Sequence, residues 1–210
     1  MPLLIAAEAM TLIEAAESPE AGGRFHHRRA AARLDDELGS PRRLALGFVG
    51  LLGIVAGGML VGLAADSFGD DDALAVVALV VGLAVGVPGV LLGLAVVRAG
   101  ERVCRAYAVW VADDAFGSPR RGTMVERLFS GRSIVRSALA AFALIASVFA
   151  WALLGLAVAP SGPVDVEGLR VAMVTMSLVW AVAFTASTFY LVAGEVRTGW
   201  AHSQSVIRGR

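Results

Sequence analysis

The sequence contains no lysine and no asparagine, and it has a single cysteine among 210 residues. All eighteen basic residues are arginine, and eighteen acidic residues bring the formal net charge to zero. A lone cysteine, Cys104, excludes an internal disulfide and a multi-cysteine metal site. With no excess of basic charge to neutralise phosphates, the chain is not expected to have nucleic acid as a partner.

Catalytic signatures are also missing from the sequence. The motifs GxSxG, HExxH and CxxC and the dinucleotide-binding fingerprint do not occur. The three histidines lie outside the long apolar stretches, whereas intramembrane proteases, proton pumps and ion-coupled transporters need ionisable groups at membrane depth. We therefore predict that the protein is not an enzyme and binds no cofactor and no catalytic metal.

Apolar residues are abundant: 57% of the chain is hydrophobic and the mean hydropathy is +0.72. A soluble domain of this length rarely carries so much apolar surface, so this composition favours a membrane protein. Arginine without lysine, together with much alanine, glycine and valine, favours a GC-rich bacterial genome such as that of an actinobacterium. The expected location is the bacterial cytoplasmic membrane.

Four stretches can cross a hydrocarbon core of about 30 Å as helices, namely 44–65, 73–97, 137–159 and 171–194. Six arginines precede the first stretch, eight lie between the second and third, and three follow the last. Only Arg170 lies in the two remaining loops. Because arginine-rich loops stay in the cytoplasm, both termini are predicted to be cytoplasmic.

These features predict an all-α membrane protein with four transmembrane helices arranged as two hairpins. The expected parts are cytoplasmic N-terminal helices at 1–43, a first hairpin at 44–97, a cytoplasmic helical connection at 98–136, a second hairpin at 137–194 and a cytoplasmic tail at 195–210. We expect the tail to be partly disordered.

A pentapeptide, Gly-Ser-Pro-Arg-Arg, occurs at 39–43 and again at 117–121, each time preceded by two aspartates. Glycine ends helices, serine caps them and proline suits the first helical turn, so each copy predicts a helix, a turn and a second helix. The arginines are expected at the level of anionic lipid headgroups. A phosphate-binding loop is the alternative, although the GxxxxGK[ST] pattern is absent.

Glycines recur at four-residue spacing in the first two spans. Such spacing lets helix backbones approach closely in lipid, where no hydrophobic drive exists between helices. The pattern predicts helix packing, within one chain or between chains, through Gly53, Gly57, Gly58, Gly62, Gly82, Gly86, Gly89 and Gly93.

Two cytoplasmic helices are predicted to be amphipathic. The N-terminal one, within 1–17, carries its apolar residues on one side, and the connection continues the second span with Val103, Tyr107, Trp110 and Val111 on one face. The two aromatic residues need a cover: the bilayer surface, the N-terminal helix or a partner protein. The candidate docking residues are Tyr107, Trp110, Leu4, Ile5 and Leu12.

The last two spans carry the polar and aromatic residues. Ser177, Thr185 and Thr188 form a weakly polar stripe with Ala181, and Trp151 and Trp180 lie about 12–14 Å from the outer ends of their helices. The two indoles are therefore expected at a depth where they could meet. This region is a candidate intramembrane site for a lipid-like or quinone-like ligand, with ordinary aromatic packing as the alternative.

The first outer loop holds four carboxylates without a basic residue, Asp66, Asp70, Asp71 and Asp72. Clustered carboxylates are ligands for divalent cations, but the spacing does not match an EF-hand. A cation site and a solvated turn both remain open for this loop.

The stretch Gly86–Arg98, with the sequence GVPGVLLGLAVVR, is followed by Glu101-Arg102 and later by Gly117-Ser118-Pro119. This order resembles a family of four-span sensor domains from actinobacteria, found alone or ahead of histidine kinases. In that family the second span contains a G-x-P run and leads into a helix bearing arginine and glutamate. The resemblance implies a signalling or regulatory role and assigns no binding residues.

The leading functional hypothesis is a non-enzymatic membrane protein that acts through partners, as a regulatory, sensory or accessory subunit of a membrane complex. The expected partners are membrane lipid and either other protein subunits or further copies of this chain. The alternative is a small transporter or channel subunit, homo-oligomeric, for a neutral or lipophilic solute passing the Ser177, Thr185 and Thr188 stripe.

Overall fold

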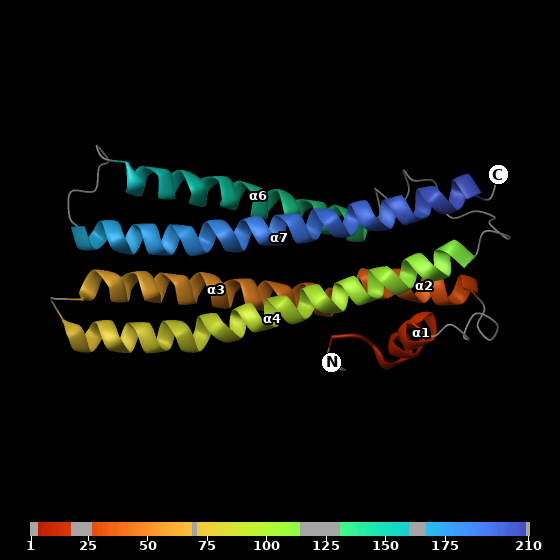
Figure 1. Cartoon of the computed structure of the whole chain (residues 1–210), viewed down its shortest axis with the longest axis horizontal. Coiled ribbons are helices and arrows are strands. Elements are labelled where there is room, and N and C mark those ends of the chain that lie inside the picture. The colour runs from red at the N-terminus through yellow and green to blue at the C-terminus, as the bar shows by residue number, and fades with distance from the viewer. Residues whose placement is uncertain (1–3, 18–26, 69–70, 114–130, 160–166, 209–210) are drawn as a thin grey trace. The chain divides into compact units, whose positions relative to one another are not determined.

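The computed structural model describes residues 4–17, 27–68, 71–113, 131–159 and 167–208. All regular secondary structure in these ranges is α-helical, as predicted. The helices are α1 Ala7–Glu17, α2 His27–Leu38, α3 Pro41–Ser67, α4 Asp72–Asp113, α6 Gly131–Val158 and α7 Glu167–Arg208 (Figure 1).

Four of these helices, α3, α4, α6 and α7, are long and apolar enough to cross a membrane, which confirms the predicted number of spans. Helix α4 continues past the second span into the connection, as predicted, and α7 continues past the predicted end of the fourth span; each contains 42 residues. The tail was expected to be partly disordered, whereas α7 is helical through Arg208. An established helix adds residues without a new nucleation step, so the span carries the tail into helical structure.

The described residues fall into two compact units. Unit 1 comprises Met1–Leu44, Ala95–Ala138 and Tyr190–Arg210, and unit 2 comprises Ala45–Leu94 and Leu139–Phe189. The apolar centres of α3, α4, α6 and α7 belong to unit 2. Helices α1 and α2 and the charged extension of α4 belong to unit 1.

Unit 2 is packed as expected for a protein in lipid. Every described residue that is buried in it is glycine, alanine or serine. Large apolar side chains lie outside, with Phe142 61%, Ile145 70% and Phe189 71% exposed. Small residues at helix contacts and large ones on the outer surface are typical of helices surrounded by acyl chains.

Unit 1 is packed as expected for a protein in water. Its fully buried side chains include Ile13, Leu34, Val103 and Trp110. Arg33, Arg42 and Arg105 are exposed. Large apolar residues inside and charges outside indicate that this unit folds through the hydrophobic effect. The two units therefore differ in packing: small residues are buried in unit 2, and large apolar residues are buried in unit 1.

The first Gly-Ser-Pro-Arg-Arg copy forms the predicted turn between two helices. The backbone N–H of Gly39 donates to the carbonyl of Asp35 (3.3 Å), and that of Ser40 donates to the carbonyl of Glu37 (3.1 Å). Helix α2 ends at Leu38 and α3 begins at Pro41, where a missing N–H costs nothing. The second copy, at 117–121, lies outside the described residues.

Candidate functional site

The buried core of unit 1 is built around Trp110 on α4. This side chain is 2% exposed, and its indole N–H donates to the backbone carbonyl of Leu12 on α1 at 3.1 Å. Ile5, Ile13 and Leu34 belong to the same cluster. Helix α4 thus presents an aromatic face, which α1 and α2 cover. Figure 1 shows these two helices beside the later part of α4.

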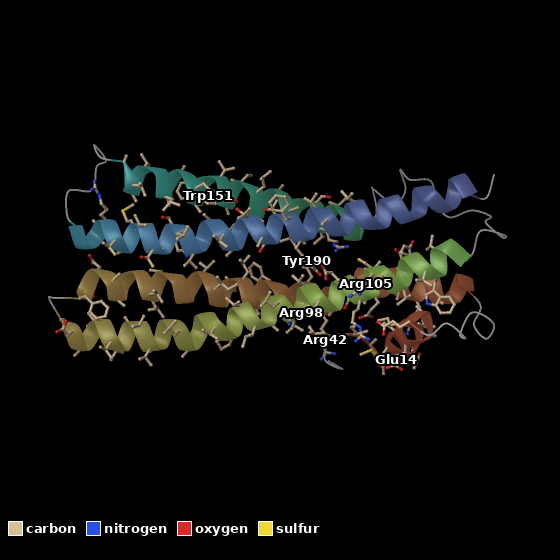
Figure 2. All side chains as sticks on the ribbon, viewed as in Figure 1. Glu14, Arg42, Arg98, Arg105, Trp151 and Tyr190 are labelled. Atoms are coloured by element: carbon tan, nitrogen blue, oxygen red, sulfur yellow. The ribbon has the colours of Figure 1, made fainter. Side chains whose placement is uncertain are left out.

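Two ion pairs lie at the edges of this core. Arg102 on α4 donates to both carboxylate oxygens of Glu17 at the end of α1, at 3.1 and 2.9 Å. Arg33 on α2 pairs with Glu8 at the beginning of α1. Glu14 of α1, labelled in Figure 2, also acts electrostatically on Arg102. The acidic side of α1 is therefore attached to a surface rich in arginine.

The candidate docking residues lie in this interface. Tyr107 and Trp110 are 3% and 2% exposed, Ile5 is buried, and Leu4 and Leu12 are partly buried against the cluster. The predicted apolar face of α4, which also includes Val103 and Val111, is buried as a whole. Of the three covers left open by the sequence, the structure contains the N-terminal helix. Docking of a separate partner on these residues stays a prediction.

Glu17 gives the docking of α1 a dependence on pH. Its pKa lies below the usual value of 4.5, first because of the hydrogen bonds from Arg102, partly offset by burial, and further because of the charges of Arg102 and Arg105. A lowered pKa in the folded state means that this stabilisation is complete above pH 4.5 and is lost as the pH falls through the lower value. Because Glu17 and Arg102 are 52% and 31% exposed, the effect is small.

We expect Glu17→Gln to increase amide hydrogen exchange in α1 at pH 7, because the charged pair with Arg102 is lost. At a pH well below 4.5 wild type and variant should exchange equally, once exchange is corrected for its intrinsic pH dependence. Glu14→Gln, a change of the same chemistry at an exposed position of α1, is the control and should have the smaller effect at pH 7. Equal exchange of wild type and Glu17→Gln at pH 7 would contradict the role assigned to the pair.

A second polar cluster lies within unit 2, between α6 and α7. The Ser147 and Thr185 hydroxyls are 2.6 Å apart, and the Trp151 indole N–H donates to Thr185 Oγ1 at 3.1 Å. Trp151 is 48% exposed (labelled in Figure 2), whereas Ser147 is buried. The three side chains hydrogen-bond to one another, so they join α6 to α7 within two of the candidate spans.

Trp180 has a different partner from Trp151. Its indole N–H donates to the carbonyl of Val55 on α3 at 3.0 Å. The sequence suggested that the two indoles could meet, but the described hydrogen bonds direct them to different helices. The ligand site expected around them stays a prediction.

The other hydroxyls of the predicted stripe bond within α7. Ser177 is 1% exposed and its hydroxyl donates to the Met173 carbonyl. The Thr188 hydroxyl donates to the Phe184 carbonyl at 2.9 Å. Such bonds to the preceding turn satisfy a hydroxyl in an apolar environment. Hydrogen bonds within α7 therefore satisfy these two hydroxyls without a ligand.

The glycines bring α3 close to two neighbours. A Cβ added at Gly57 would lie 2.6 Å from the Cα of Gly86, and one at Gly53 would lie 3.2 Å from the Cα of Gly89. A Cβ added at Gly82 would lie 3.1 Å from the Gly57 carbonyl oxygen. Backbone therefore meets backbone along the α3–α4 contact, and α4 residue numbers fall as those of α3 rise.

The remaining glycines differ in their surroundings. Gly58 and Gly62 face α7, where a Cβ would lie 2.8 Å from Val179 Cγ1 and 3.1 Å from the Ala172 carbonyl, respectively. A Cβ at Gly93 would have no described neighbour within 4 Å. Gly50, which the four-residue pattern did not single out, lies against α4, where its Cβ would be 3.0 Å from the Gly89 carbonyl.

The outer-loop carboxylates take different positions. Asp71 accepts a hydrogen bond from the backbone N–H of Leu74 at 3.1 Å, so it caps α4. Asp66 is partly buried and Asp72 is exposed, while Asp70 lies outside the described residues. Among the described residues, no group of three His, Cys, Asp or Glu side chains is placed to hold a metal ion.

Sequence reasoning missed one cluster of polar residues in unit 1. Arg43, expected at the lipid surface, is only 5% exposed, and Tyr190 of α7 was not considered at all. The available signal was position, because both residues lie within a few positions of the end of a predicted span.

The chain matches no protein-family model, no curated protein and no solved structure. The resemblance to four-span sensor domains therefore stays a prediction, and function must be argued from the contacts described above.

Proposed function

We propose that the protein is a non-enzymatic regulatory, sensory or accessory subunit of a bacterial membrane complex, and that it acts through partners. In this proposal α3 with α4 and α6 with α7 form two transmembrane hairpins, and both termini are cytoplasmic. The arginine distribution supports that orientation, since seventeen of the eighteen lie outside the two short loops assigned to the outer side. The change from lipid-type packing in unit 2 to water-type packing in unit 1 also supports it.

The main support for this proposal is the docking of α1 on α4. Helix α1 is a separate 11-residue helix that covers a tryptophan on α4. A helix of this length is marginal by itself in water, so its structure depends on the surface to which it is bound. Residues 18–26 connect it to α2, and covalent attachment therefore keeps it close to this surface after release.

Release of α1 would expose apolar surface on α4 and α2, chiefly at Val103, Trp110 and Leu34. The surface left behind would be flanked by Arg33 and Arg102, which now pair with carboxylates of α1. The matching partner is an amphipathic helix with carboxylates beside its apolar face, which is the chemistry of α1 itself. Regulation then consists of competition between α1 and the partner helix for one surface.

A charge swap tests this competition. Glu17→Arg places three arginines together, because Arg102 and Arg105 already face this position, and should release α1. The double variant Glu17→Arg with Arg102→Glu restores an opposite pair in the reverse order and should bind α1 again. Both are compared with wild type after gentle extraction from native membranes, by native mass spectrometry.

We expect a stoichiometric partner in the mass spectrum, several-fold more of it with Glu17→Arg than with wild type, and a return toward wild type in the double variant. A single species near 21.7 kDa in all three samples would contradict the proposal. If the amount of partner is the same in all three samples, the accessory role is retained, but the competition between α1 and the partner helix is rejected.

A further inference from the structure

Arg43 lies in an environment that its sequence position did not indicate. It is the third residue of α3, directly before the first apolar stretch, and it is 5% exposed. Its Nη2 donates to the backbone carbonyl of Glu37, near the end of α2. Among the residues that the structure describes, its buried Nη1 has no hydrogen-bond partner. A buried guanidinium nitrogen without an acceptor is costly, so this group needs an anion or a lone pair.

A second guanidinium acts electrostatically on the first. Besides Arg136 on α6, which also makes an interaction of its own, the Tyr190 hydroxyl on α7, the Cys104 thiol on α4 and the Glu37 carboxylate act on Arg43. Arg136 is also in contact range of α7, since its Nη2 would lie 3.1 Å from a Cβ at Gly194. Two like charges brought together in a partly buried place repel each other, and an anion between them removes that repulsion.

The acidic groups nearby are already engaged. The Glu37 carboxylate accepts a hydrogen bond from the backbone N–H of Ala6 at 3.4 Å. Glu101 on α4 acts on the Tyr190 hydroxyl and makes an interaction of its own. These carboxylates lower the local positive charge, but neither reaches Arg43 Nη1 among the described contacts.

Tyr190 supplies a third donor to the same cluster. Its hydroxyl donates to the Val96 carbonyl at 3.3 Å, which is long for an O–H donor. The ring crosses α4 at Gly100, where an added Cβ would lie 2.1 Å from the hydroxyl oxygen. Only glycine leaves room for the tyrosine at this point, so the position of the hydroxyl is built into the contact between α4 and α7.

The cluster lies where each apolar stretch meets charged sequence. Leu44 follows Arg43, the predicted third span begins at 137, and Arg98 follows the apolar part of α4. In a bilayer this level corresponds to the headgroups, where the phosphates of anionic lipids are concentrated. Planar guanidinium groups bind phosphate oxygens in a bidentate manner, and a phenolic hydroxyl adds a further donor.

We propose that Arg43 and Arg136 bind one phosphate group, carried by a phospholipid headgroup or present as free inorganic phosphate. The single O–H of Tyr190 turns from the Val96 carbonyl to the same phosphate when the site is occupied. The site joins α3, α6 and α7 within unit 1, so its occupation stabilises their association. This proposal is independent of the competition proposed for α1.

The test measures thermal unfolding in dodecyl maltoside micelles, which contain no phosphate. One arm adds sodium phosphate against sodium chloride at equal ionic strength, and the other adds phosphatidylglycerol, with lipid adducts followed by native mass spectrometry. The variants are Arg43→Gln, Arg136→Gln and Tyr190→Phe. Arg42→Gln removes the same charge from the exposed neighbouring residue and is the matched control.

We expect at least one of the two additives to raise the midpoint of unfolding of wild type and of Arg42→Gln. Arg43→Gln and Arg136→Gln should weaken binding by about tenfold or more, and Tyr190→Phe by less, because a charged donor contributes more than a neutral one. If phosphatidylglycerol alone is effective, the source is a lipid headgroup. If sodium phosphate is also effective, the site accepts free phosphate.

Two results would overturn the proposal. The first is that neither additive stabilises wild type, and the second is that Arg42→Gln weakens the binding of phosphate or lipid as much as Arg43→Gln does. If Arg43→Gln does not fold, Arg43→Lys decides, because it keeps the charge but not the planar fork. Binding by Arg43→Lys as tight as that of wild type would also reject the guanidinium site.

Discussion

Trp110→Ala should release α1 from α4 and cost about 3–5 kcal/mol, the usual range for truncating a buried tryptophan. The side chain is 2% exposed and its N–H bonds Leu12, so truncation removes both the packing and a donor. Because α1 has only 11 residues, it cannot retain its helix once this contact is lost. Hydrogen exchange in residues 7–17 should rise to the level of an unfolded peptide.

Trp110→Phe is the intermediate case, because it keeps most of the ring and loses the hydrogen bond to Leu12. Val109→Ala changes the next residue on α4, which is 43% exposed, and serves as the control. Its exchange in α1 should equal that of wild type. Protection of α1 in Trp110→Ala at the wild-type level would contradict the docking role of this residue.

Gly57→Ala should separate α3 from α4 and destabilise unit 2 by about 1–3 kcal/mol. The new methyl carbon would lie 2.6 Å from the Cα of Gly86 and 2.8 Å from the Gly82 carbonyl oxygen. Both neighbours are backbone atoms, so the strain is relieved only by moving a whole helix. Unfolding in dodecyl sulfate mixed micelles, followed by circular dichroism, measures the change.

Gly93→Ala is the matched control on the same pair of helices. No described atom lies within 4 Å of a Cβ at this position. Stability should stay the same or rise by up to about 1 kcal/mol, because alanine favours the helix over glycine. Equal destabilisation by Gly57→Ala and Gly93→Ala would show that the close approach at Gly57 does not carry the effect.

The four long helices could be predicted from the sequence because hydropathy is a local property. A chain in lipid must satisfy its backbone internally, so a long apolar stretch has few structural choices. The neighbours of each glycine could not be predicted in the same way. Gly57 and Gly58 are adjacent, yet the first contacts α4 and the second contacts α7, because successive helical residues point about 100° apart.

The cover over Trp110 was left open for a related reason. Periodicity predicted the apolar face of α4, but a face does not identify what packs on it. The partner helix is almost a hundred residues away in the sequence, and only three-dimensional packing brings Leu12 to the indole. The sequence could indicate that a cover was needed, and no more.

Arg42 and Arg43 show the limit of assigning a motif to one environment. Their expected level at the lipid headgroups stays a prediction, but the two side chains differ in burial: Arg42 is exposed, whereas Arg43 is buried against the last turn of α2. The turn formed by Gly39 and Ser40 brings the carbonyls of α2 within reach of Arg43. Basic side chains are favoured there because those carbonyls have no helical partners.

The most direct test of the docked α1 is the distance between α1 and α4 in a bilayer. Nitroxide labels at positions 14 and 109, in place of the exposed Glu14 and Val109, with Cys104→Ser as the background, report this distance by pulsed electron resonance in nanodiscs. We expect one narrow, short distribution for the otherwise unchanged protein and a broad, longer one after Glu17→Arg. A broad, long distribution without Glu17→Arg would contradict the docked helix on which the proposed function depends.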